Sequence, residues 1–257
     1  MTKYEGYLVD LDGTTYRGKE RIPEAEVFIR HLLNEGFPFK LVTNNATKTV
    51  EEIVHNLNSY YDIPIDSSHV YTSIIALGDY IELHHPGANV YVLGEAALKE
   101  QMLERNFTAD TNKPIDIVVQ GLKRDVTYDQ LTVAVQAILA GAEYVVTNTD
   151  RLIPTETGMN PSSGAITAFI QFATRKEPII IGKPNNPIME GALKQLGIDK
   201  SKVLMIGDNY DTDIMAGMNM DMDTLLVLTG VTVREDLEMI QKQPTYIIES
   251  LSEWKHA

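Results

Sequence analysis

The chain has 257 residues, of which 44% are hydrophobic, and its formal net charge is −14. This length and apolar content are enough to bury a core, so we expect a folded protein and exclude a disordered one. The acidic charge argues against nucleic acid and anionic membranes as partners, because clustered Lys and Arg side chains bind both. An anionic small molecule would therefore need a local positive site, made from a few basic groups, backbone N–H groups or a bound cation.

The chain contains no cysteine, which excludes disulfides, thiolate zinc sites and thiol nucleophiles. The start, MTKYEGYLVDLDG, has neither the charged segment nor the long apolar run of a secretion signal. No apolar run reaches the roughly 18 residues of a spanning helix. We therefore expect a cytoplasmic protein without membrane contact, and the sequence leaves a homo-oligomer open.

Apolar segments of strand length alternate with amphipathic helical segments along the chain. A strand over residues 7–10 precedes a helix that begins at Pro23 and ends before Gly36, since proline favours the first turn and glycine the position past the end. FKLVTNN is a second strand, a helix starts after its asparagines, and HVYTS is a third short strand. This alternation predicts an α/β fold with a doubly wound parallel sheet.

The middle of the chain repeats the pattern, with strands in NVYVLGE, IDIVVQGL and EYVVTN separated by helices. Three strands with three helices can bury a core of their own. The runs PIIIGKP, KVLMIGDN, TLLVLTG and TYIIES then resume the first sheet. We therefore expect a discontinuous core domain of residues 1–77 and 180–257, with an inserted α/β domain of residues 78–179.

Four predicted strands end in small or polar residues. In a doubly wound sheet, ligands bind at the carboxyl ends of the strands, near the switch in strand order. If these strands are neighbours, their ends meet at one crevice. The four strand ends are Asp10-Leu11-Asp12-Gly13-Thr14, Thr43-Asn44-Asn45, Gly182-Lys183-Pro184 and Gly207-Asp208-Asn209.

The acidic residues at these strand ends indicate a metal site. Strand alternation places Asp10 and Asp12 on the same side, so both can address one substrate. Together with Asp208 they would repel strongly, and a bound cation is the natural remedy. Oxygen ligands without His or Cys favour Mg²⁺, which binds through a few carboxylates and a phosphate oxygen.

The remaining strand-end residues suit a phosphoryl group. Lys183 adds a positive charge, while Thr43 and Asn44 offer donors just before a helix N-terminus, where anions bind well. A carboxylate beside the phosphorus can act as nucleophile and form an aspartyl phosphate. The second carboxylate can protonate the leaving oxygen and later activate water.

The set DLDGT, TNN, GKP and GDNYDTD, in this order, resembles the haloacid dehalogenase (HAD) superfamily of phosphatases, and closely its NagD-like, p-nitrophenylphosphatase-like subfamily IIA. The family inserts an α/β cap domain of the C2 type between the second and third motifs, where the extra β-α units lie. The resemblance implies that Asp10 is the nucleophile and Asp12 the general acid/base. It also implies that Asp10, the backbone carbonyl of Asp12, and Asp208 bind Mg²⁺.

The same resemblance implies roles for the other motif residues. Thr43 and Asn44 would bind the phosphoryl group, and Lys183 would neutralise it and orient Asp10. Asp213, with Asn209 beside it in the same motif, would support Lys183 or metal-bound water. Residues 14–18 would form the flexible turn with which the family senses cap closure.

The inserted domain should select the substrate. Its polar segment TNTDRLIPTETGMNPSSGA, between a predicted strand and a predicted helix, is our candidate for the loop that contacts the leaving group. Asn148, Asp150 and Arg151 could bind hydroxyl or acid groups there. An ordinary connection between a strand and a helix explains the segment equally well.

The sequence thus predicts a Mg²⁺-dependent phosphatase for small phosphorylated metabolites, with acid sugar phosphates or nucleoside monophosphates suggested by the resemblance. One alternative is a receiver-like signalling module that keeps its phospho-aspartate, although such modules have about half this length and no inserted domain. Another is a non-catalytic protein that binds phosphorylated metabolites. Competing signatures for phosphate binding or serine hydrolysis, namely GxGxxG, GxxxxGK[ST] and GxSxG, do not occur in the sequence.

Overall fold

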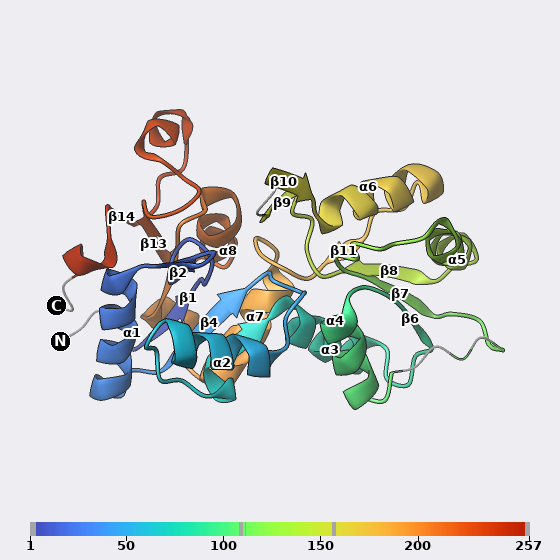
Figure 1. The fold of residues 1–257 in the computed structure, drawn as a ribbon, viewed down its shortest axis with the longest axis horizontal. Helices are drawn as coiled ribbons and strands as arrows, with labels where there is room; N and C mark the ends of the chain where they lie inside the picture. Colours follow the sequence, from blue (N-terminus) through green and yellow to red (C-terminus); the bar gives the residue numbers. More distant parts are fainter. Residues whose placement is uncertain (1–3, 108–109, 111, 156–157, 255–257) are drawn as a thin grey trace. The chain divides into compact units, whose positions relative to one another are not determined.

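The computed structural model describes residues 4–107, 110, 112–155 and 158–254. The chain forms two compact units, and each has its own sheet of parallel strands with helices packed against it (Figure 1). This architecture confirms the predicted fold class. The first unit comprises Met1–Thr43, Val50–Tyr71 and Lys183–Ala257, and the second comprises Asn44–Thr49 and Thr72–Gly182.

The first unit contains a sheet of six strands in the order β14-β13-β12-β1-β4-β5. Strand β1 pairs in parallel with β4 on one side and with β12 on the other. The strand order therefore reverses between β1 and β12, which is the place where doubly wound sheets bind ligands. The strands are β1 Gly6–Val9, β4 Phe39–Thr43, β5 Val70–Thr72, β12 Val203–Gly207, β13 Asp223–Val227 and β14 Tyr246–Ile248.

Helices cover both faces of this sheet. Leu225 and Val227 of β13 belong to the same buried cluster as α1 (Pro23–Glu35) and α2 (Val50–Tyr60), whereas Leu226 between them packs with α8 (Met215–Asn219). Alternate residues of a strand point to opposite faces, so α8 lies on the face away from α1 and α2. The remaining elements of this unit are β2 Tyr16–Arg17, β3 Glu20–Arg21, η1 Ser67–His69, α7 Asn186–Leu196, η2 Lys200–Lys202, η3 Tyr210–Ile214, η4 Arg234–Met239 and η5 Leu251–Glu253.

Helix α1 begins and ends where the sequence predicts. Pro23 stands in its first turn, where the missing N–H costs no hydrogen bond. Gly36 follows the last turn with a φ of 72°, and its N–H bonds the carbonyls of Leu32 and Leu33. Glycine adopts this left-handed backbone without steric cost, so the residue ends the helix cleanly.

The second unit contains a parallel four-stranded sheet in the order β11-β8-β7-β6. Its core joins apolar residues of the strands to those of α5 and α6, for example Val118, Ile138 and Ile170. Strands β9 and β10 pair in antiparallel fashion before α6. The elements are α3 Ser73–His84, β6 Val90–Leu93, α4 Ala96–Glu104, β7 Ile117–Gln120, α5 Tyr128–Leu139, β8 Glu143–Val146, β9 Leu152–Thr155, β10 Gly158–Pro161, α6 Ser163–Thr174 and β11 Ile179–Ile180.

The boundaries of the units differ from the expected residues 78 and 180. Helix α3 begins at Ser73, where the Thr72 hydroxyl accepts a hydrogen bond from the N–H of Ile75 at 3.2 Å. Strand β11 pairs with β8 in the second unit and so does not resume the first sheet. A two-residue apolar strand carries no signal for its partner, because pairing is decided by tertiary packing.

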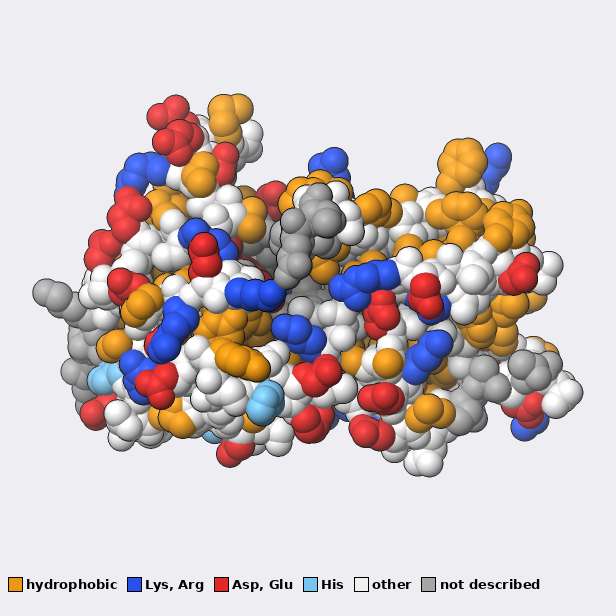
Figure 2. Space-filling model, viewed as in Figure 1, with side chains coloured by type: hydrophobic (Ala, Val, Ile, Leu, Met, Phe, Trp, Pro, Cys, Tyr) orange, Lys and Arg blue, Asp and Glu red, His pale blue; other side chains and the backbone are white. Residues whose placement is uncertain are grey.

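On the face drawn in Figure 2, Lys and Arg side chains are interspersed with Asp and Glu. Among the described residues, no helix combines the length and the apolar character needed to cross a membrane.

Candidate active site

Three of the four predicted strand ends lie side by side in the first unit, because β12, β1 and β4 are neighbours in the sheet. Asp10 directly follows β1, Asp208 directly follows β12, and Thr43 is the last residue of β4. All three side chains are buried, with Asp208 only 1% exposed. The structure therefore brings these residues to one edge of the sheet, as the strand pattern predicts.

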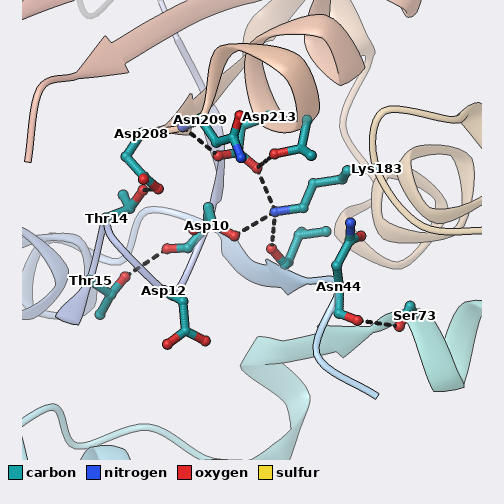
Figure 3. Close-up of polar contacts among 12 residues, drawn as sticks. Asp10, Asp12, Thr14, Thr15, Asn44, Ser73, Lys183, Asp208, Asn209 and Asp213 are labelled. Atoms are coloured by element: carbon teal, nitrogen blue, oxygen red, sulfur yellow. Dashed lines mark hydrogen bonds and ion pairs between the residues drawn. The ribbon is translucent and has the colours of Figure 1, made fainter. Parts of the chain in front are cut away.

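Lys183 reaches the same edge by a different route from the one predicted. The sequence places it after a strand of the first sheet, which is wrong, because the preceding strand β11 pairs with β8. Its ammonium group nevertheless lies 2.5 Å from Oδ1 of Asp10 and 2.8 Å from Oδ1 of Asp213. It also donates to the carbonyl of Val42 at 2.7 Å, so three acceptors fix one buried cation (Figure 3).

Asp213 contacts this lysine, and the backbone of Asn209 in turn bonds Asp213. Oδ1 of Asp213 contacts Lys183, and Oδ2 accepts the backbone N–H of Asn209 at 3.1 Å. The Asn209 side chain in turn accepts the N–H of Asp211 at 3.0 Å, which fixes the start of the following helical turn. Gly207 makes room for Asp213, since a Cβ at this position would lie 2.2 Å from the Asp213 Cβ.

The burial of these charges shifts the pKa values of the groups involved. Burial by itself lowers the pKa of Lys183, but Asp10 and Asp213 outweigh that effect, so the pKa is raised and the lysine stays charged. Burial and the repulsion from Asp213 raise the pKa of Asp10 well above its ordinary value, although Lys183 opposes this shift. The cluster therefore carries more negative charge than one lysine neutralises.

Asp208 stands on the far side of the cluster from these lysine contacts (Figure 3). Its Oδ1 accepts the Thr14 hydroxyl at 3.0 Å, and its Oδ2 accepts the backbone N–H of Val231 at 2.7 Å. Burial and the repulsion from Asp213 raise the pKa of Asp208 to about 6, and these two hydrogen bonds partly offset the shift.

The cluster fits a divalent cation. One carboxylate oxygen from each of Asp10, Asp208 and Asp213 lies within 4.8 Å of the others. Asp10 and Asp208, whose pKa values are raised, need either a proton or a cation to remain close together. An all-oxygen donor set suits a hard ion such as Mg²⁺. Both oxygens of Asp213 already have partners in Lys183 and Asn209. Both oxygens of Asp208 also have partners, but these are the neutral donors of Thr14 and Val231, so Asp208 keeps its full charge for a cation.

Asp12 differs from Asp10 in its surroundings. Its residue is exposed, and Oδ2 accepts a long hydrogen bond of 3.4 Å from the Tyr16 hydroxyl. The Tyr16 ring stacks on Tyr61, with 4.7 Å between the ring centroids, and the Tyr61 hydroxyl donates to the carbonyl of Gly18 at 2.8 Å. The turn at residues 14–18 thus packs on the body of the first unit.

Asn44 belongs to the second unit, although it directly follows Thr43 in the chain. Its backbone carbonyl accepts the Ser73 hydroxyl at 3.0 Å and the Asn148 amide at 2.7 Å. Its side chain lies against Gly182, where a Cβ would come within 2.6 Å of Oδ1. These contacts anchor the start of the second unit, and the predicted phosphate contact of Asn44 stays a prediction.

The candidate specificity loop lies only partly in the described residues, because residues 156–157 fall outside them. Asn148 is 5% exposed, its amide donates to Asn44, and its Oδ1 accepts from Ser163 and from the N–H of Asp150. These bonds hold Asn148 within the second unit, and its predicted substrate contact stays a prediction. Arg151 is exposed, and its predicted role stays a prediction, as does that of Asp150.

The sequence did not identify two groups that hold Asp208. The sequence pattern predicts Thr14 only as part of a turn, whereas its hydroxyl donates to Oδ1 of Asp208. The donor from Val231 is a backbone N–H, which every residue except proline has, so no residue type signals it. Gly13, by contrast, is visible in the sequence as a residue type with a structural reason. It has a φ of 99°, and a Cβ there would lie 2.3 Å from Asp208 Oδ2.

The raised pKa of Asp208 predicts a pH dependence of stability in the presence of a chelator. The folded value is about 6, against 3.8 for the ordinary group, so the native state holds this proton more tightly than the unfolded state. The contribution of Asp208 to the free energy of unfolding is then fully present below about pH 4 and is lost as the pH rises through about 6. We expect the loss to be on the order of 2 to 3 kcal/mol.

Chemical denaturation of the wild type and of Asp208→Asn at several pH values measures this contribution. The stability of the wild type relative to the variant should fall between about pH 4 and pH 7. A constant difference across this range would show that Asp208 does not carry the raised pKa.

Comparisons with known proteins agree with the fold and the strand-end motifs. A family model described as haloacid dehalogenase-like hydrolase matches residues 7–108, and a second HAD-hydrolase-like model matches residues 180–254. The chain is 44% identical over 254 residues to 5'-nucleotidase YutF of Bacillus subtilis, which covers 99% of this chain and 98% of that one. It is 43% identical to an acid sugar phosphatase of Staphylococcus aureus over 253 residues, with coverages of 98% and 97%.

Solved structures give the same result. A double mutant of a thermostable NPPase from Geobacillus stearothermophilus is 44% identical, with full coverage of both chains and a TM-score of 0.93. A p-nitrophenyl phosphatase from Archaeoglobus fulgidus is 31% identical, covers 97% of each chain and has a TM-score of 0.91.

The fold and the strand-end residues are those of an α/β hydrolase, and its three clustered aspartates can hold a divalent cation. The chain belongs to the haloacid dehalogenase-like hydrolases, and the NagD-like, p-nitrophenylphosphatase-like resemblance is confirmed. The predicted phosphoric monoester hydrolase activity is confirmed with it, so the signalling and binding-protein alternatives are set aside.

Proposed function

We propose that this phosphatase hydrolyses small phosphorylated metabolites in two steps, with a phosphoryl group carried transiently on Asp10 and with Mg²⁺ as cofactor. The observation that carries the proposal is the buried contact of 2.5 Å between the Lys183 ammonium and Oδ1 of Asp10. It fixes one oxygen of Asp10 at the end of β1, and it supports the proposal because a cation beside the nucleophile can stabilise a phosphoryl oxygen.

In the first step, a carboxylate oxygen of Asp10 attacks phosphorus and the bond from phosphorus to the leaving oxygen breaks. The charge of Lys183 stabilises the phosphoryl oxygens, and Thr43 at the end of β4 supplies a further donor. Because Lys183 also contacts Asp213 and the Val42 carbonyl, its ammonium group is held before substrate arrives. This preorganisation lowers the cost of reaching the transition state.

Asp12 acts as the general acid in the first step and as the general base in the second. It gives a proton to the leaving oxygen in the first step and takes one from the attacking water in the second, which restores the Asp10 carboxylate and releases phosphate. The exposure of Asp12 supports this role, because an exposed carboxyl group can reach the leaving group and exchange its proton with water. The buried Asp10 suits the nucleophile for the opposite reason, since a desolvated carboxylate attacks without losing a water shell.

Mg²⁺ would be held by Asp10, Asp208 and the backbone carbonyl of Asp12, and when bound it neutralises the carboxylates and draws charge from the phosphoryl oxygens. Asp213 and Asn209 support Lys183 and complete the site. The second unit, which replaces the predicted cap at residues 78–179, would select the leaving group.

The names of the relatives suggest two substrate classes. Acid sugar phosphatase and 5'-nucleotidase are the names of proteins 42% and 44% identical to this chain, so we propose phosphorylated acid sugars or nucleoside monophosphates as substrates. A panel of steady-state assays distinguishes them. It should pair a sugar acid phosphate with the matching neutral sugar alcohol phosphate, and a nucleoside monophosphate with the matching ribose phosphate.

A preference of at least about 10-fold in kcat/KM for the acidic member of the first pair indicates a group that binds the carboxylate. Such a ratio corresponds to about 1.4 kcal/mol of extra transition-state stabilisation for the acidic substrate. The same preference in the second pair indicates a base-binding group. Equal values in both pairs would contradict selection by the leaving group. Turnover without any divalent metal would contradict the cofactor assignment.

A further inference from the structure

Residues 229–232 form a loop between β13 and the following helical turn, and this loop holds Asp208 at two places. The N–H of Val231 donates to Oδ2 of the Asp208 side chain at 2.7 Å, and the N–H of Thr232 donates to the Asp208 backbone carbonyl at 3.1 Å. The Thr232 hydroxyl also accepts the N–H of Tyr210 at 2.8 Å. The loop is therefore hydrogen-bonded to Asp208 and Tyr210, in the segment that follows β12.

Two glycines let the neighbouring loops close over the carboxylate. A Cβ on Gly230 would lie 1.9 Å from Asp208 Oδ2, and a Cβ on Gly13 would lie 2.3 Å from the same atom. Gly13 follows β1 and Gly230 follows β13, which are the two neighbours of β12 in the sheet. The Asp208 carboxylate is thus enclosed from both sides by loops that could not approach it with any other residue.

Thr229 joins these two loops to each other. Its hydroxyl donates to the carbonyl of Gly13 at 2.7 Å, and its carbonyl accepts the guanidinium of Arg17. Gly13 is followed by Thr14, whose hydroxyl donates to Oδ1 of Asp208 at 3.0 Å. Oδ1 of Asp208 therefore accepts from the loop after β1, and Oδ2 accepts from the loop after β13. The hydrogen bond from Thr229 to Gly13 joins these two loops.

The two donors to Asp208 are neutral, a backbone amide and a hydroxyl, whereas Asp10 and Asp213 contact the charge of Lys183. A neutral donor orients a carboxylate and leaves its full negative charge for a cation. Each carboxylate oxygen has two lone pairs, so a single hydrogen bond leaves acceptor capacity on both atoms. A carboxylate prepared in this way is ordered before a metal arrives.

We propose that the Thr229–Val231 segment, together with Thr14, is a clasp that positions the Asp208 carboxylate as a metal ligand, with the Val231 N–H as its central donor. The proposal rests on the proposed function, because it assumes that Asp208 binds the metal. It assigns a role to LTGVT, a segment outside the four strand-end motifs. Partners that orient a metal ligand typically change metal affinity by about 10- to 100-fold when they are removed.

Binding of Mn²⁺ to the full chain, measured by isothermal titration calorimetry, tests the clasp independently of turnover. Val231→Pro removes the N–H donor, and Val231→Ala keeps it. Thr14→Val removes the hydroxyl with little change of shape, and Thr14→Ser keeps it. We expect Mn²⁺ to bind about 10- to 100-fold more weakly to Val231→Pro and Thr14→Val, and within about twofold of the wild type to Val231→Ala and Thr14→Ser.

Activity gives a second readout. In Val231→Pro and Thr14→Val, the Mg²⁺ concentration at half-maximal activity should rise by the same factor as the Mn²⁺ dissociation constant, while kcat at saturating Mg²⁺ should return to near the wild-type value. A role in folding alone would lower kcat at all Mg²⁺ concentrations. If Val231→Pro does not fold, as judged by circular dichroism, the isosteric pair at Thr14 decides the question.

Asp208→Asn separates the two possible failures. If this variant keeps wild-type Mn²⁺ affinity, then Asp208 is not a metal ligand and the proposed function is wrong at that residue. If it loses affinity while Thr14→Val and Val231→Pro keep it, then Asp208 binds the metal without the clasp and the inference is overturned.

Discussion

Asp10→Asn should reduce turnover of any phosphate monoester by roughly 10⁴- to 10⁶-fold, the range found when a nucleophile is removed. The amide keeps an acceptor for Lys183 but cannot form the phosphorylated intermediate. Because the pKa of Asp10 is raised by burial and by the repulsion from Asp213, replacing it with a neutral group should not destabilise the fold. Steady-state assays together with thermal unfolding separate loss of chemistry from loss of structure.

Asp211→Asn is the matched control for this experiment. Asp211 is exposed and lies in the same GDNYDTD motif, but its side chain has no assigned role. Its variant should keep kcat/KM within about threefold of the wild type, as surface substitutions usually do. Equal activity of Asp10→Asn and Asp211→Asn would contradict the nucleophile assignment.

Lys183→Met should lower both stability and activity. The substitution leaves Asp10 and Asp213 buried without their cation, and breaking a buried ion pair by removing one partner typically costs about 3 to 5 kcal/mol. Turnover should fall by at least about 100-fold, because the charge that faces the phosphoryl oxygens is lost. Urea denaturation and initial-rate assays measure the two effects.

Lys123→Met provides the comparison. Lys123 is also buried, but its partner Asp125, at 2.5 Å, is 82% exposed and can be solvated when the lysine is removed. We expect a stability loss of about 1 kcal/mol or less, in the range of exposed ion pairs. A similar loss in both variants would mean that the Lys183 contacts are no stronger than a surface pair.

The central features of the site were predictable because they depend on local patterns. A buried strand that ends in Asp-x-Asp places both residues at the carboxyl edge of a parallel sheet, whatever the rest of the chain does. The structure adds the contrast between a buried Asp10 and an exposed Asp12. That contrast depends on the loops around the strand end, which the spacing of the two residues does not specify.

Other features depend on tertiary pairing and could not be predicted. The apolar run before Lys183 is compatible with either sheet, and only its pairing with β8 assigns it to the second unit. Asn148 has the polar side chain of a binding residue, but Asn44 and Ser163 use it to hold the second unit together. The donor from Val231 belongs to the backbone, so the residue type at this position carries no information about it.

The phosphorylated form of Asp10 is the central claim, and trapping it is the most direct test. Asp12→Asn should slow the hydrolysis of the intermediate, because it lacks the base that activates water. This variant is mixed with substrate and Mg²⁺, quenched in acid and digested, and the peptides are analysed by mass spectrometry. We predict one phosphoryl group on the peptide that contains Asp10 and none in the same experiment with Asp10→Asn. Phosphate release by the wild type, with no phosphoryl group on that peptide in the variant or in the rapidly quenched wild type, would contradict the account.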